Sequence, residues 1–180
     1  MTHLHYCSDT ATTASSFAPP VLNLADSALL RLGEYLRDRD YRFVTTTPLT
    51  HSRVIGRGAS QGTNFTRAFG WNLPFSASDL PANVLNALAE AKAVAHCGAL
   101  LRSRVRFSTL RDQLYAHSAF PTEAADSVFF GPDTYRFARC IESVLKAQPF
   151  SPLPPRRILD LGCGSGAGGI YAASVMKFGV

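Results

Sequence analysis

Three glycines alternate with small residues in the last part of the sequence, between an apolar run and a segment of helical character. The run from Ile158 to Leu161 predicts a strand, Gly162, Gly164 and Gly166 follow it, and "AGGIYAASVMK" then predicts a helix. Glycines allow a tight turn and leave room for a ligand at the amino-terminal end of a helix. The loop "GCGSGA" also satisfies the dinucleotide pattern G-x-G-x-x-A, so the chemistry indicated is the binding of a nucleotide-type cofactor.

Asp160 stands two positions before Gly162 and discriminates between the cofactors that such a loop could hold. A carboxylate at this place would repel the diphosphate of a nicotinamide or flavin cofactor. The run from Asp160 to Gly166 resembles motif I of the class I S-adenosylmethionine-dependent methyltransferases, in which the acid lies near the cationic methionine half of the cofactor. The resemblance implies that S-adenosylmethionine is held by Asp160, Gly162, Cys163, Gly164 and Gly166.

A second segment, "VFFGPDTYRFARCIESVL", is similar to the segment before motif I in HemK-type glutamine methyltransferases and their methyltransferase small-domain relatives. Pro132, Asp133 and Thr134 match the family's proline, acid and threonine, and the resemblance implies that Thr134 bonds to the methionine end of the cofactor. From the residues alone, Asp133 or Thr134 can equally cap the helix that follows. Release-factor methyltransferases usually have arginine and glutamate where this chain has Gly131 and Tyr135, so a glutamine substrate is only one of the possibilities.

Two parts of that family's site have no counterpart in the sequence. The catalytic Asn/Asp-Pro-Pro-Tyr/Phe tetrapeptide is absent, because the Pro-Pro pairs are Pro19-Pro20 and Pro154-Pro155 in other contexts. The acid that binds the ribose, expected about 20 residues after the glycine loop, would fall at or beyond Val180. We therefore predict no catalytic residue, and we expect these 180 residues to be inactive and to bind the cofactor weakly or not at all.

The sequence predicts an α/β protein in three parts. Residues 1–20 are expected to be a flexible amino terminus, residues 21–120 a helical, winged-helix-like substrate-recognition domain, and residues 121–180 the incomplete start of a Rossmann-like methyltransferase domain. The main hydrophobic core is expected between Leu22 and Ala119. The proline-rich "PFSPLPPRR" predicts a linker before motif I.

Local signals place the expected elements. Helices are predicted over 21–40, with Asn23 or Asp26 as cap, from the Thr-Pro step at 47–48, over 64–71, and over 76–96, with Ser78 or Asp79 as cap. Strands are predicted over 102–107, 114–119 and 127–130, and a helix from Asp133 to about Lys146.

Arg102, Arg104 and Arg106 recur at strand spacing and are expected to share one side of a hairpin. Three arginines on one face could follow a phosphate backbone. The alternative function is therefore a non-catalytic module that binds nucleic acid. The plainer interpretation is a solvated face that protects an exposed strand edge.

The composition limits which partners, metal sites and cellular locations are compatible with the sequence. The net charge of +5 permits a nucleic-acid or acidic partner without requiring one, so either a protein or a nucleic acid can be the substrate. The four cysteines are scattered and have no histidine at ligand spacing, so we expect neither a metal site nor disulfides. With no apolar run of membrane-spanning length and no signal-peptide pattern, we expect a cytoplasmic protein that does not bind membranes.

Overall fold

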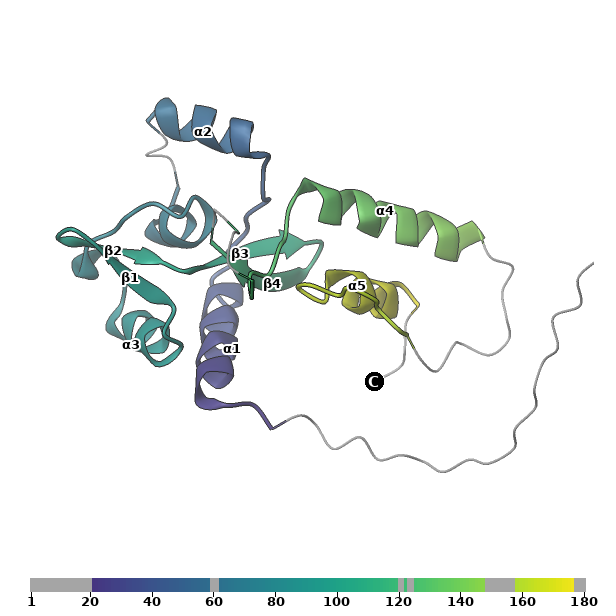
Figure 1. The fold of residues 1–180 in the computed structure, drawn as a ribbon, viewed down its shortest axis with the longest axis horizontal. Coiled ribbons are helices and arrows are strands. Elements are labelled where there is room, and N and C mark those ends of the chain that lie inside the picture. Colours follow the sequence, from purple (N-terminus) through teal and green to yellow (C-terminus); the bar gives the residue numbers. More distant parts are fainter. Residues whose placement is uncertain (1–20, 59–61, 120–121, 123–124, 148–157, 177–180) are drawn as a thin grey trace, which may run out of the picture.

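Helices are mixed with two small antiparallel sheets in the computed structural model, which describes residues 21–58, 62–119, 122, 125–147 and 158–176 (Figure 1). This mixture confirms an α/β fold. The elements, in chain order, are α1 (Leu24–Arg37), α2 (Pro48–Gly56), the π-helical turn η1 (Thr66–Gly70), the 3-10 turn η2 (Ala77–Asp79), α3 (Ala82–Glu90), β1 (Val94–Cys97), β2 (Leu100–Ser103), β3 (Val105–Leu110), β4 (Gln113–Ser118), α4 (Pro132–Ala147) and α5 (Ala167–Val175).

The caps of the first two helices follow the sequence signals. The side chain of Asn23 accepts a hydrogen bond from the Asp26 amide at the start of α1. Thr47 accepts one from the Thr50 amide at the start of α2, where Pro48 is the first helical residue. Each cap satisfies a backbone donor that the helix itself leaves unpaired, and both predictions are confirmed.

The helix predicted over 76–96 is shorter than expected. Ser76, not Ser78 or Asp79, caps the η2 turn in a reciprocal capping box with Asp79, and α3 begins only after Pro81. The helix ends at Glu90, and Lys92 takes a left-handed backbone conformation with φ of 53°. Residues 94–97, which were predicted to be helical, form strand β1 and pair with β2. This pairing outweighs the local preference of the segment for a helix.

The strand predicted over 102–107 is divided between two sheets. β2 pairs with β1, whereas β3 pairs with β4 in a register that sets Val105 opposite Ser118. Arg104 lies between the two strands, and its amide donates to the Ala93 carbonyl. The Arg102 and Arg106 side chains consequently extend from different sheets.

The first hydrophobic core lies between α1, α3, η1 and β3. Leu32, Leu36, Phe69, Leu88 and Phe107 are almost completely buried in it. The ring of Phe69 meets the ring of Phe107 edge to face, with centroids 5.8 Å apart. This cluster falls within the range in which the main core was expected.

A second hydrophobic cluster joins the end of the β3–β4 hairpin to α4 and α5, which lie side by side (Figure 1). Tyr115, Phe130, Ala138 and Tyr171 are buried in it, together with Leu110 and Ala167. The Glu142 carboxylate on α4 reinforces the junction by accepting hydrogen bonds from Arg111 in the hairpin turn, Lys146 and Tyr171. These donors hold the Glu142 pKa at about 2.

The two strands predicted beside the glycine loop are not formed. Residues 127–130 form no strand. Only Val128 among them bonds to the hairpin, through one hydrogen bond from the Ser118 amide and one to the Ser118 hydroxyl. Residues 158–161 are also irregular, and Leu159 and Leu161 are each 83% exposed. A parallel strand is stable when neighbouring strands and both faces are covered, and the described residues provide no neighbouring strand here. The linker predicted in 149–157 and the flexible segment 1–20 lie outside the described residues.

Among the described helices, none is both long and apolar enough to cross a membrane.

Gly70 is expected to be required for the first core. A Cβ at this position would lie 2.3 Å from Cδ2 of the Phe43 ring, whereas a Cβ on Gly56 would meet no atom within 4 Å. Gly70→Ala should therefore destabilise the protein by about 1–3 kcal/mol, and Gly56→Ala by less than about 0.5 kcal/mol. Urea denaturation measures both. Equal midpoints for the two variants would contradict the close packing of Phe43 against η1.

Candidate functional site

The glycine loop between residues 162 and 166 has the backbone conformation that its sequence predicts. Gly162, Gly164 and Gly166 have φ angles of 70°, 52° and 71°, in the left-handed region that residues with a Cβ rarely adopt. The Gly166 amide donates to the Cys163 carbonyl at 2.7 Å and closes the turn, and Gly166 is the residue from which α5 starts. The Cys163 side chain is exposed. The loop thus presents its backbone at the amino-terminal end of a helix.

Asp160 is held against the first turn of α5. Its Oδ2 atom accepts a hydrogen bond of 2.7 Å from the Gly169 amide, an arrangement that the positive end of the helix dipole favours. The approach is close, because a Cβ on Gly168 would lie 3.1 Å from Oδ2 and one on Gly169 3.2 Å from the Asp160 Cβ. The two glycines that open α5 therefore make room for the carboxylate.

The segment before α4 reaches the glycine loop through Phe129. The Phe129 carbonyl oxygen lies 3.8 Å from the position that a Cβ on Gly164 would take. Gly131 is buried, and a Cβ there would lie 2.5 Å from the Phe129 ring, so this ring packs directly over the Gly131 backbone. The structure thus brings together the two segments that sequence analysis singled out.

Thr134 lies in the first turn of α4. Its Oγ1 accepts a hydrogen bond from the Gly131 amide at 3.2 Å, and its own amide donates to the Gly131 carbonyl at 3.0 Å. Asp133 takes no part in these bonds and pairs with Arg136 at 3.1 Å. Because α4 begins at Pro132, the prediction that Asp133 or Thr134 is its amino-terminal cap is wrong, and Thr134 instead bonds back to Gly131 from within the first turn.

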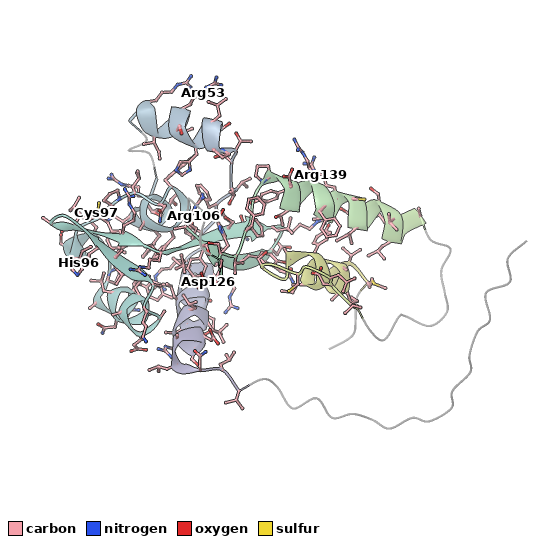
Figure 2. The ribbon with its side chains drawn as sticks, viewed as in Figure 1. Arg53, His96, Cys97, Arg106, Asp126 and Arg139 are labelled. Atoms are coloured by element: carbon pink, nitrogen blue, oxygen red, sulfur yellow. The ribbon has the colours of Figure 1, made fainter. Side chains whose placement is uncertain are left out.

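The prediction that Arg102, Arg104 and Arg106 share one side of a hairpin is wrong. Arg102 and Arg104 are exposed, but Arg106 is only 5% exposed, and Figure 2 shows it in the interior, while Arg53 and Arg139 project from the outer sides of their helices. The Arg106 Nε atom donates to the Gly70 carbonyl at 2.8 Å, and its guanidinium lies 5.5 Å from the centroid of the Phe43 ring. Both alternatives predicted for these arginines assume one exposed face, whereas both faces of β3 are covered.

Arg106 and His117 face each other across the β3–β4 hairpin and open onto a cavity of about 350 Å³. The other walls of this cavity come from the segment Thr45–Ser52 and from Phe129–Asp133. Sequence analysis missed this site. The signal that could have revealed it is the register of the predicted hairpin, which sets Arg106 opposite His117 on one side of the sheet.

His117 is kept neutral by its surroundings. Its Nδ1 lies 3.1 Å from the Ser118 carbonyl and its Nε2 2.8 Å from Ser108 Oγ. A carbonyl can only accept, so Nδ1 carries the proton and Nε2 accepts from the serine hydroxyl. The ring stacks on Phe130, with centroids 5.3 Å apart. Burial, with the charge of Arg106 as a smaller cause, lowers the His117 pKa to about 4.

The part of the chain that the structure describes contains no cluster of histidine, cysteine or acidic side chains able to hold a metal ion. Cys97, Cys140 and Cys163 are free thiols.

No family model, curated protein or solved structure matches the chain. The functional argument therefore depends on the residues and their geometry.

His117 is expected to make the protein less stable in mild acid. The unfolded chain protonates this ring near pH 6.5 and the folded protein only near pH 4, so stability falls as the pH drops through that window and is constant above it. The loss approaches about 3 kcal/mol. Unfolding free energies of the parent and of His117→Gln should show a much smaller pH slope in the variant. His96→Gln, at an exposed position on β1, is the matched control. An unchanged slope in His117→Gln would show that the ring titrates normally.

Proposed function

We propose that the chain carries the amino-terminal part of a class I, HemK-like S-adenosylmethionine-dependent methyltransferase. In this proposal residues 21–120 form the winged-helix-like recognition domain and residues 121–180 begin the Rossmann-like domain. The observation that carries it is the contact between the two segments on which the resemblance rests: the Phe129 carbonyl lies beside Gly164.

The geometry of the loop fits such a cofactor. A Cβ on Gly162 would meet no atom within 4 Å, and one on Gly164 would meet only the Phe129 and Gly162 carbonyl oxygens, at 3.8 and 3.9 Å. The loop backbone is thus open to a ligand. The Asp160 carboxylate, held at the start of α5, favours a cationic group and disfavours a diphosphate. These features favour S-adenosylmethionine over a dinucleotide.

This placement indicates what the cofactor and the protein would each contribute to the reaction. S-adenosylmethionine supplies an activated methyl group, so the protein's task is alignment and not bond activation. Asp160 would orient the amino group of the methionine half, and Gly162, Gly164 and Gly166, with Cys163, would let the ligand lie against the backbone. Thr134, already bonded to Gly131, would line the neighbouring turn. The acceptor is a nitrogen of a protein side chain or of a nucleic acid.

The alternative, a nucleic-acid-binding module, is weakened by the burial of Arg106. Arg102 and Arg104 remain exposed, but two arginines on separate segments do not form the continuous face that the alternative assumed. We therefore favour the methyltransferase.

Binding to the glycine loop can be measured by nuclear magnetic resonance, which detects weak complexes. S-adenosylmethionine added to the ¹⁵N-labelled chain is expected to shift the amide signals of Gly162, Gly164 and Gly166. Asp160→Ala should abolish these shifts by removing the carboxylate, and Gly164→Val by placing a branched side chain where the ligand approaches. Asp126→Ala, at an exposed carboxylate elsewhere, should leave them unchanged.

Two results would contradict the proposal. Shifts caused by NADH but not by S-adenosylmethionine would assign the loop to a dinucleotide. Saturation of the loop shifts at micromolar S-adenosylmethionine would contradict the part of the proposal in which these residues hold only a portion of the cofactor site.

A further inference from the structure

The cavity beside Arg106 contains an unusual pair of polar atoms. Within the described residues, the buried side-chain nitrogen and oxygen atoms that lack a hydrogen-bond partner are Arg106 Nη2 and Thr46 Oγ1. Both residues line the same cavity. An unpaired buried polar atom costs about 1–3 kcal/mol, and more when the group is charged. Two such atoms at one cavity indicate groups that a ligand satisfies.

The charge of Arg106 is not neutralised by a neighbouring carboxylate in the described structure. Among the residues that the structure describes, no acidic one contributes to the Arg106 pKa, which burial lowers and the nearby Tyr41 and Tyr135 raise. Its hydrogen bond goes to a neutral acceptor, the Gly70 carbonyl. A guanidinium stays protonated in proteins, so the cavity wall carries one buried positive charge.

The other ionisable groups of the cavity do not change this balance at neutral pH. Burial and the charge of Arg106 lower the pKa values of both His51 and His117, so neither ring adds a positive charge. Asp133 and Arg136 also line the cavity, but they are paired with each other and are each 78% exposed. The net charge presented by the buried wall is therefore that of one guanidinium.

We propose that this cavity binds a small organic acid with a single carboxylate, whose oxygens accept hydrogen bonds from Arg106 Nη2 and from the Thr46 hydroxyl. A monoanion balances one guanidinium, whereas a phosphate dianion would leave an excess negative charge in a buried place. Pro48, Phe129 and Phe130 supply an apolar wall for the rest of the molecule. A volume of about 350 Å³ suits a ligand of metabolite size.

The site is distinct from the glycine loop but adjacent to it. Phe129 lines the cavity, and its carbonyl lies beside Gly164. The proposal does not depend on the methyltransferase assignment, because it uses none of the residues from Asp160 to Gly166. If both are correct, the carboxylate ligand lies next to the cofactor loop.

The test is a titration of the side-chain Nε–H signal of Arg106 by nuclear magnetic resonance at constant ionic strength and neutral pH. Sodium benzoate, acetate, phosphate and chloride are the probes. Benzoate is expected to shift the signal to saturation, with acetate at least about threefold weaker because it leaves the apolar wall uncovered. Tighter binding of phosphate than of benzoate would overturn the proposal, as would a chloride effect equal to that of benzoate or no saturable shift with any probe.

Variants distinguish benzoate binding in the cavity from benzoate binding elsewhere on the surface. Thr46→Val removes only the hydroxyl and should weaken benzoate binding about threefold to tenfold. Arg106→Met should abolish the benzoate-dependent rise in melting temperature seen for the parent. Arg104→Met, at the exposed neighbouring position, should bind benzoate as the parent does. If Arg106→Met does not fold, Thr46→Val decides, and unchanged benzoate affinity in that variant would overturn the proposed cavity contact.

Discussion

The β3–β4 hairpin is the element on which the rest of the structure depends, because both of its faces are buried. One face turns Val105, Phe107 and Leu114 toward the core formed with α1, α3 and η1. The other face carries Leu110 and Tyr115, which pack against α4 and α5. Side chains alternate along a strand, so one pair of strands can serve two cores only when both alternating sets are covered. The same alternation places Arg106 and His117 on the second face, where Arg106 lies over the Phe43 ring of the first cluster and His117 stacks on Phe130 of the second.

Polar groups on that second face are satisfied from within the hairpin and from the neighbouring segment. Ser108 bonds to both His117 and Thr45, which ties the β3–β4 pair to the chain that leads into α2. The Tyr135 hydroxyl accepts from the Thr45 amide, so α4 is tied to the same segment. Arg106 is the exception, since its guanidinium is only partly satisfied. A well-packed network with one unsatisfied cation is the arrangement expected of a binding site, because a purely structural role would favour an apolar residue of similar size.

The two proposed sites meet at Phe129. Its carbonyl borders the glycine loop, its side chain packs over Gly131, and it lines the cavity of Arg106. A ligand in the cavity and a cofactor at the loop would thus both lie beside this one short segment. In a methyltransferase, a recognition domain must bring its substrate to the cofactor, and this segment is where residues from the amino-terminal and carboxyl-terminal parts of the chain come together. Leu159 and Leu161, close to it in the chain's last part, are exposed.

Local chemistry was sufficient for features that depend on one or two residues. Asn23 and Thr47 as caps, the left-handed glycines at 162, 164 and 166, and the turn between β3 and β4 could all be predicted, because each satisfies a backbone requirement within a few residues. Features that depend on distant partners could not. The segment 94–97 became a strand because β2 was available to pair with it, and 158–161 remained irregular because no described strand lies beside it. The strand predicted from the spacing of the arginines does form from Val105 onward. Spacing alone, however, does not determine which face of a strand is exposed to solvent. Only the packing of Phe43, η1 and Phe130 around β3 decided that Arg106 is buried, and with it where the cavity lies.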